Sequence, residues 1–287
     1  MKAWIVVNGF VNSGKFHELY GFLSRAAQKR GISLSVKTSD SLIAPVGERI
    51  TDAERPDFVL FWDKDTSLAR RIEAEGVRLF NSARAIEICD SKALTAEALA
   101  GKVDTPKTVI APKTFEGLGY NKCDFVEKTA EILGLPMVIK ESYGSFGAQV
   151  YLANTIDEAK GIVASLGHKD FIMQEFIAES CGRDMRVNVV GDKVVSAMER
   201  YNDNDFRSNI TNGGKMKKAT LTPEIVAAAV RSAEIIGLDF AGVDVLFGKS
   251  GPIVCEVNSN PHFKSSLECT GVDMSECIMD YIMEKMQ

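Results

Sequence analysis

The stretch from Gly242 to Pro261 constrains the fold of this chain more than any other, because it reads as two apolar strands joined by a glycine-bounded turn. Asp244, Glu256 and Asn258 interrupt the apolar runs. Side chains alternate between the two faces of a strand, so Glu256 and Asn258 point the same way. Two carboxylates and an amide oxygen on one face would suit Mg²⁺ beside nucleotide phosphates. The alternative is an ordinary hairpin with exposed polar residues.

Whether Asp244 shares that face depends on the register of the hairpin. A three-residue loop at Lys249–Gly251 would pair Gly248 with Pro252, and hence Asp244 with Glu256. Such loops favour a last residue in the left-handed region, and the glycine at the end of this loop supplies it. A two-residue loop would turn Asp244 to the opposite face.

The composition is that of an ordinary globular chain. A net charge of -5 over 287 residues leaves no basic footprint for a nucleic-acid partner. No apolar run approaches the length of a membrane span, and the first residues read as a strand rather than a signal peptide. Six cysteines without Cys-x-x-Cys spacing and three scattered histidines argue against a zinc site, and they predict a reducing, cytoplasmic location.

The chain is expected to divide into three parts. Residues 1–88 alternate strands and helices, which implies parallel pairing in an α/β layer. Residues 89–178 and 179–287 also contain strands and helices, but the two do not alternate strictly. Phe58–Trp62 has the composition of a buried strand, and the alanine-rich run Pro223–Ile236 is typical of a helix. We therefore expect a combined α/β and α+β fold.

Three shorter segments carry local predictions. Asn81-Ser82 has the composition of a helix cap, and the residues from Asp90 to Ala100 have helical spacing. The basic run of Lys215, Lys217 and Lys218 is expected in a solvated surface loop, with attraction of an acidic acceptor as the alternative.

A glycine-rich segment follows the apolar run that ends at Lys140. Gly144 and Gly147 would let backbone N–H groups approach phosphate oxygens, and Ser142 and Ser145 add hydroxyl groups. Lys140 would neutralise phosphate charge. A plain glycine-rich turn is the alternative.

The segment Met173–Glu179 is predicted to be a strand end that becomes a loop. Its backbone could contact the edge of an adenine ring, while Phe176 and Ile177 pack on the face of the ring. Taken alone, the segment favours an ordinary core strand, and adenine binding is the alternative.

Arginines then follow one another ahead of the hairpin. Arg186 lies in an apolar run and must pair with an anion if it is buried. Arg200 ends the next predicted strand and Arg207 follows it shortly. Guanidinium groups form forked hydrogen bonds with phosphates and carboxylates, so this grouping favours an anionic ligand over separate structural ion pairs.

The run from Gly9 to Phe16 nearly matches a P-loop, since it follows a predicted strand and precedes a predicted helix. That motif needs a Ser or Thr hydroxyl for Mg²⁺ where Phe16 stands. We expect this loop to cap a substrate cleft, and a P-loop kinase or ATPase that uses Lys15 is the alternative.

Taken in order, these stretches resemble the ATP-grasp superfamily, and most closely its RimK-like amino-acid ligases. The resemblance implies an ATP-grasp fold with a Rossmann-like N-terminal domain (1–88), a central subdomain with a glycine-rich lid (89–178) and a C-terminal subdomain with the metal site (179–287). The matching residues run from Asp90 onward and are densest in Gly182–Arg186, Ala197–Arg200, Asp205–Asn209, Gly213-Gly214, Ala241–Asp244 and Glu256–Asn258.

The resemblance also implies roles for the matching positions. Mg²⁺, or Mn²⁺ in its place, would be bound by Asp244, Glu256 and Asn258. The phosphates or the reacting carboxylate would be contacted by Arg200, Arg207 and Asn209. The phosphates, ribose and base of ATP would be held by Lys92, Lys140, Ser142, Gly144, Ser145, Gly147, Glu175, Phe176, Ile177, Asp184 and Arg186.

The activity that the resemblance implies is ATP-dependent ligation of a carboxylate to an amine. ATP would convert the carboxylate into an acyl phosphate, and the amine of an α-amino acid would attack it to form an amide or peptide bond. A non-catalytic nucleotide-binding protein is one alternative. A biotin-carboxylase-like carboxylation is another, for which the chain is short.

The substrates are expected to be an amino acid and a small-molecule or peptide carboxylate, the latter bound near Asn8, Gly9 and Asn12. His262 and Phe263 depart from the family pattern of a small residue, Pro and Gly, and are expected to reshape the amino-acid pocket. For His262 itself a hydrogen-bonded loop histidine is favoured, and a substrate contact is the alternative. The sequence leaves the oligomeric state open, and the resemblance implies a homodimer or homotetramer.

Overall fold

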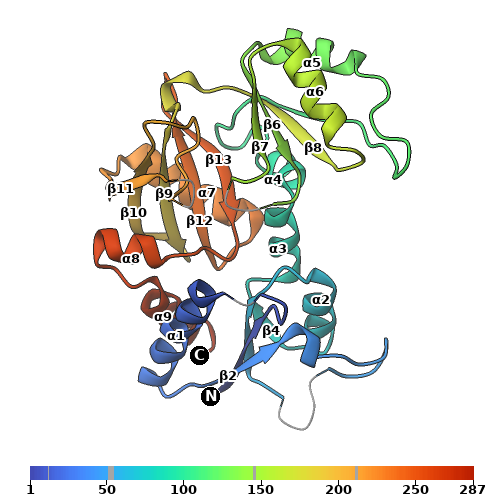
Figure 1. The fold of residues 1–287 in the computed structure, drawn as a ribbon. Helices are drawn as coiled ribbons and strands as arrows, with labels where there is room; N and C mark the ends of the chain where they lie inside the picture. The colour runs from blue at the N-terminus through green and yellow to red at the C-terminus, as the bar shows by residue number, and fades with distance from the viewer. Residues whose placement is uncertain (12, 51–54, 145–146, 211–212) are drawn as a thin grey trace.

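Three sheets with packed helices make up the computed structural model, which describes residues 1–11, 13–50, 55–144, 147–210 and 213–287. In Figure 1 the N-terminal sheet lies at the bottom, the C-terminal sheet at the left and the central sheet at the upper right. Within the described ranges, no helix has both the length and the apolar character that crossing a bilayer requires.

The N-terminal sheet is parallel, as the alternation of strands and helices predicts, and its strand order is β2-β1-β3-β4. Alternate residues of β3 enter two different apolar cores, with Leu60 in one and Phe61 in the other. Both faces of this strand are therefore covered, which explains its unbroken apolar sequence. The elements are β1 (Lys2–Val7), α1 (Gly14–Lys29), β2 (Ser33–Thr38), a 3₁₀ turn η1 (Ser39–Ser41), β3 (Phe58–Trp62), α2 (Thr66–Ala74), β4 (Arg78–Phe80) and α3 (Ala83–Asp90).

Asn81 joins the N-terminal sheet to the C-terminal strands instead of capping α3. Ser82 alone forms the predicted cap. The buried Asn81 amide donates to the carbonyl oxygens of Phe240 and Ser259 at 3.0 and 2.8 Å. Its Oδ1 accepts from the backbone N–H groups of Asp239 and Phe240 at 2.6 and 3.2 Å. The prediction for Asn81 is wrong because these buried backbone groups use its side chain.

The predicted helix from Asp90 to Ala100 forms as the helix Lys92–Leu99, while Asp90 is the last residue of the preceding helix α3. Ser91 has extended backbone angles, and its side chain caps the second helix, α4 (Lys92–Leu99). This break places Lys92 at the first position of α4, where it lines the cleft described below.

The central sheet is antiparallel, and its strand order is β5-β8-β6-β7. Two helices pack against it around a separate apolar core. The elements are β5 (Thr108–Ile110), α5 (Asp124–Leu133), β6 (Met137–Glu141), β7 (Val150–Ala153), α6 (Ile156–Ser165) and β8 (Phe171–Glu175), with a 3₁₀ turn η2 (Ala178–Ser180) after it.

The C-terminal sheet is antiparallel, and its strand order is β11-β10-β9-β12-β13. The expected surface loop at Lys215–Lys218 is the edge strand β11, so that prediction is wrong. Lysines are common on exposed edges because they discourage pairing with another chain. The elements are β9 (Arg183–Val190), β10 (Lys193–Tyr201), β11 (Lys215–Lys218), α7 (Pro223–Ile236, as predicted), β12 (Phe240–Phe247), β13 (Pro252–Asn258), α8 (Lys264–Thr270) and α9 (Met274–Lys285).

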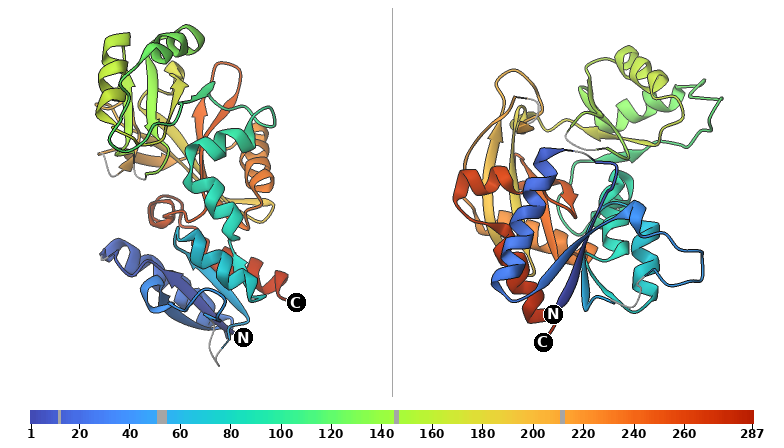
Figure 2. Two further views of the ribbon diagram at one scale, coloured as in Figure 1. Left: turned by 90° about the vertical axis from the view of Figure 1, so that its right-hand side faces the viewer. Right: turned by 60° about the horizontal axis from the view of Figure 1, so that its bottom comes forward.

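The last helix returns to the N-terminal part of the molecule. Figures 1 and 2 show α9 beside α1, with the two ends of the chain close together. Ile278 and Ile282 of α9 share one apolar core with Leu19 and Leu23 of α1. This packing fixes the N-terminal sheet against the C-terminal one.

Candidate active site

A cleft of about 1110 Å³ is lined by residues from all three parts of the chain. The predicted ligand-binding residues among its lining are Lys92, Lys140, Gly144, Gly147, Glu175, Phe176, Ile177, Asp184, Arg186, Arg200, Arg207, Asn209, Asp244, Glu256 and Asn258. Ser142 is not part of the lining, since its side chain is 2% exposed. Ser145 lies outside the described residues.

The hairpin places Asp244 opposite Glu256, as predicted, but by a different route. Phe247 pairs with Pro252, so the loop is one residue longer than expected, and the pairing of Gly248 with Pro252 is wrong. A regular ladder from that loop would put Asp244 opposite Cys255. A β-bulge at this point shifts the register by one residue and returns Asp244 to the face of Glu256.

The carboxylate of Asp244 lies between two arginines. Arg186 contacts both carboxylate oxygens, with Nη2 2.9 Å from Oδ2, and Arg200 Nη2 lies 3.0 Å from Oδ1. Arg200 also contacts both oxygens of Asp184, at 2.7 and 2.5 Å. Burial alone would raise the pKa of Asp244, but the two guanidiniums outweigh it and lower the pKa. Two cations thus balance two anions, of which Arg200 and Asp244 are buried and Arg186 and Asp184 are partly buried.

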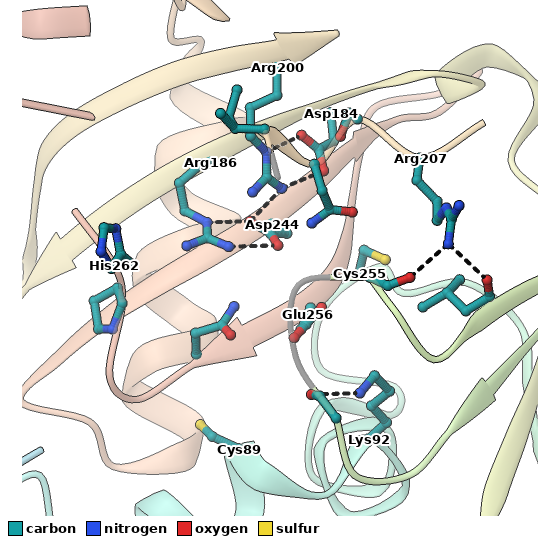
Figure 3. Close-up of a pocket in the computed structure, with 18 of the residues that line it drawn as sticks. Cys89, Lys92, Asp184, Arg186, Arg200, Arg207, Asp244, Cys255, Glu256 and His262 are labelled. Atoms are coloured by element: carbon teal, nitrogen blue, oxygen red, sulfur yellow. Dashed lines mark hydrogen bonds and ion pairs between the residues drawn. The ribbon is translucent and has the colours of Figure 1, made fainter. Parts of the chain in front are cut away.

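The predicted metal-binding residues fit a hard cation under one condition. In Figure 3 Asp244 and Glu256 lie on the same side of the hairpin, toward the cleft. Asn258 donates its Nδ2 to the Gly242 carbonyl at 3.3 Å, which leaves its amide oxygen free to coordinate. Among the residues that the structure describes, Glu256 forms no hydrogen bond or ion pair, and no three acidic, His or Cys side chains form a metal cluster. The two carboxylates and the amide form an oxygen set only when the arginines yield an oxygen of Asp244.

Lys92 and Lys140, from the central part of the chain, lie across the cleft from Asp244 and Glu256. Lys92 Nζ lies 3.4 Å from the Gly144 carbonyl, and Lys140 Nζ lies 3.2 Å from Sγ of Cys255 in the bulge. Burial lowers the pKa of Lys92, and the charge of Lys140 acts in the same direction while Glu256 opposes it. Two ammonium groups beside the glycine-rich loop are suited to polyphosphate.

The glycine-rich loop is tied to the C-terminal part by Arg207. Arg207 Nη1 donates to the Gly147 carbonyl at 2.9 Å (Figure 3). Asp205 holds the same guanidinium at 2.7 Å. Gly147 has a φ of +72°, which favours glycine at this position. The link joins the segment after β6 to the segment after β10. Asn209 follows in the same segment and lines the cleft.

The segment after β8 forms the inner wall. Phe176 and Ile177 line the cleft, as expected for a base-binding strip. The carboxylate of Glu175 accepts from the backbone N–H of Lys107 at 2.6 Å, so it fastens β8 to the start of β5. Gln174 supports the same junction through Thr108 at 2.9 Å.

The P-loop-like run lies on the N-terminal wall of the cleft. Phe16 packs against the apolar core, and its ring centroid lies 6.0 Å from that of His262. Lys15 is exposed at the start of α1. Asn8 lines the cleft and Gly9 does not, while Asn12 lies outside the described residues.

Sequence reasoning missed several lining residues. Asp63 follows a buried parallel strand directly, and such strand ends commonly carry functional residues, so a signal was present. Asn260 stands in the run noted for His262 and also lines the cleft. Cys255 reaches the cleft through the bulge, for which the sequence carries no signal.

Comparisons with known proteins agree with this geometry. A family model described as the RimK-like ATP-grasp domain matches residues 89–282. A "Probable alpha-L-glutamate ligase" from Syntrophotalea carbinolica is 40% identical over 221 residues, which is 76% of this chain and 71% of that protein. One with the same name from Picosynechococcus sp. is 37% identical over 227 residues, again covering 76% and 71%. The crystal structure of a RimK domain ATP-grasp protein from Sphaerobacter thermophilus superposes with a TM-score of 0.75 at 20% identity, covering 98% of this chain and 99% of that one.

Proposed function

This chain belongs to the RimK-like ATP-grasp family and is an ATP-dependent ligase; we propose that it joins the amino group of an α-amino acid to the carboxylate of a peptide or small molecule. The observation that carries the proposal is a cleft with oxygen ligands on the C-terminal wall and ammonium groups on the central wall. Such a cleft can hold a triphosphate next to a second anion.

We assign the nucleotide to the central half of the cleft. Lys92 and Lys140 would hold phosphate oxygens, with the backbone of the glycine-rich segment around Gly144 and Gly147 above them. Phe176 and Ile177 would pack on the base. ATP-grasp ligases use ATP with Mg²⁺, which polarises phosphoryl oxygens and offsets their charge when bound. Glu256, Asn258 and a released Asp244 would coordinate it.

The reaction follows from the charges that must meet. A carboxylate oxygen of the acceptor attacks the γ-phosphorus, ADP leaves, and an acyl phosphate remains. The amine attacks the acyl carbon, phosphate leaves, and one proton is lost from the nitrogen. Arg200 and Arg207 would offset the negative charge that gathers around the transferred phosphoryl group. The link from Arg207 to the Gly147 carbonyl would help to keep water from the acyl phosphate.

Two alternatives are less well supported. A P-loop enzyme requires a hydroxyl where Phe16 packs into the core. A nucleotide-binding protein without catalysis has no need of the paired Asp184, Arg200 and Asp244 beside the metal-binding face. We also propose a cytoplasmic location, where ATP is available and all six cysteines remain free, as they are here. A homodimer or homotetramer is a further proposal that light scattering can test.

The test is an ADP-release screen that combines ATP and Mg²⁺ with amino acids and carboxylate acceptors, with mass detection of the adduct. We expect release that requires one amino acid and one acceptor together, and loss of release in Glu256→Ala. The fold of that variant should persist, because Glu256 forms no ion pair among the described residues. Absence of any adduct from the wild type refutes ligation, and normal turnover by Glu256→Ala refutes the metal assignment.

A further inference from the structure

Asp63, Asn260 and His262 meet where the N-terminal sheet touches the loop after β13, and we call this group the Asp63 corner. Asp63 follows the last residue of β3, whereas Asn260 and His262 lie between β13 and α8. Asn260 Nδ2 donates to the Asp63 carbonyl at 3.0 Å, so the two segments touch. All three residues line the cleft.

The carboxylate of Asp63 is buried without a cation. Asp63 is 7% exposed. Oδ1 accepts from the Lys64 backbone N–H at 2.7 Å, and Asn8 Nδ2 reaches the two oxygens only at 3.3 and 3.4 Å. No ion pair to Asp63 occurs within the described part of the chain. A buried carboxylate is costly unless a positive charge neutralises it, so this position favours a cationic ligand.

Each of the other two members of the corner has one buried polar atom without a hydrogen-bond partner among the described residues. The Oδ1 atom of Asn260 and the Nε2 atom of His262 are buried, and neither has a hydrogen-bond partner among the residues that the structure describes. Burial lowers the pKa of His262, a hydrogen bond with the Lys15 backbone opposes this, and the charges of Lys15, Arg186 and Lys264 lower it further. The imidazole is therefore neutral near pH 7, and one of its ring nitrogens accepts hydrogen bonds.

The surplus of acceptors defines the chemistry of the ligand. A primary ammonium carries one positive charge and three N–H donors and accepts no hydrogen bond. A phosphate or carboxylate would instead be repelled by Asp63. In Figure 3 His262 lies beside Arg186, on the opposite side of the view from Arg207. His262 thus lies apart from the contact between Arg207 and Gly147.

We propose that the Asp63 corner binds the ammonium group of the amine substrate, with Asp63 as its counter-ion and Asn260 and His262 as hydrogen-bond acceptors. This inference rests on the proposed ligase function and adds a site to it. It places the amine in its ammonium form before reaction, so the nitrogen must lose one proton before it attacks the acyl carbon. It also gives a role to His262, whose position departs from the family pattern.

The test compares Asp63→Asn with Asp65→Asn as its matched control. Both changes remove one carboxylate charge from the same loop, but Asp65 caps α2 and does not line the cleft. Asn caps helices as well as Asp does, so the control should behave as wild type. In the ADP-release assay we expect Asp63→Asn to raise the KM for the amine about tenfold or more. The KM for ATP should change less than about twofold, because the nucleotide binds elsewhere.

A binding measurement separates this proposal from the ligase function. Saturation-transfer NMR uses wild-type enzyme with L-glutamate, with each other amino acid that supports turnover, and with glutarate, which is glutamate without its amino group. We expect L-glutamate or another amino acid to bind and glutarate to bind weakly, and Asp63→Asn to abolish that difference. Asn260→Ala provides the same test should Asp63→Asn fail to fold.

An unchanged amine KM in a folded variant overturns the corner but leaves ligation intact. Ammonium-dependent binding without any adduct overturns ligation but supports the corner, and equal binding of both ligands overturns the corner.

Discussion

Arg186 contacts both carboxylate oxygens of Asp244, across the β9–β12 pair in which the two residues lie opposite each other. Asp244 is the residue that the sequence assigns to a divalent cation, yet both of its oxygens already serve guanidinium groups. A cation that binds this face must therefore compete with Arg186 for Asp244. Arg186 therefore limits the affinity of this face for a metal ion.

Arg186→Met should strengthen binding of Mn²⁺ to the nucleotide-free protein. A charge-assisted hydrogen bond contributes on the order of 1.5 kcal/mol, which corresponds to about a tenfold change in affinity. Titration followed by electron paramagnetic resonance measures the free Mn²⁺. The control is Arg183→Met on the same strand, because Arg183 packs on the ring of Phe247 and does not touch Asp244. Equal affinities in the two variants would argue against the competition.

Asn81→Ala should destabilise the protein by about 3 kcal/mol. The change leaves the buried backbone groups of Asp239, Phe240 and Ser259 without their partner, and each unpaired group costs about 1–3 kcal/mol before the structure relaxes. Urea unfolding followed by circular dichroism measures the difference. Asn154→Ala removes an exposed amide and should change the free energy of unfolding by less than about 1 kcal/mol. A loss of similar size in both variants would contradict the role of Asn81 as a link between sheets.

The sequence carries enough information for the main elements but not for this link. The apolar run Phe58–Trp62 fits a buried strand, and the alanine-rich run Pro223–Ile236 fits a helix. Both form as predicted. Asn81 resembles a helix cap, and only the distant strand β12 shows why it is needed elsewhere. Long-range partners of a polar side chain are set by packing, which short-range patterns do not record.

The site shows the same division between local and distant information. Alternation along β13 places Glu256 and Asn258 on one face without knowledge of the fold. The pairing of Asp244 with Glu256 is also correct, although a longer loop and a bulge cancel each other to produce it. The two arginines on Asp244 could not be foreseen, because pairing of β9 with β12 depends on tertiary structure.

Glu276→Gln should weaken the contact between α9 and α1 in a pH-dependent manner. Hydrogen bonds from Lys29 and Arg30 lower the pKa of Glu276 below its ordinary value of 4.5. Because the pKa falls on folding, the carboxylate stabilises the protein above pH 4.5, and this contribution is lost as the pH falls through the folded-state pKa. The partly exposed position limits the effect at pH 7 to about 1 kcal/mol. Urea unfolding between pH 7 and about pH 3.5 should show the variant and wild type converging in acid, and a constant difference would contradict the ion pair.

Lys15→Ala should leave ATP binding nearly unchanged, whereas Lys140→Ala should weaken it strongly. Lys15 is exposed at the start of α1 on the N-terminal wall, while Lys140 is 9% exposed and lies beside the bulge that carries Cys255. Loss of a buried cation that contacts phosphate should raise the Kd for ATP about tenfold or more. Loss of the exposed lysine should raise it less than about threefold. Titration with a fluorescent ATP analogue measures both. The opposite order would restore the P-loop interpretation, because a nucleotide held by Lys15 requires the phosphates to lie at the N-terminal wall.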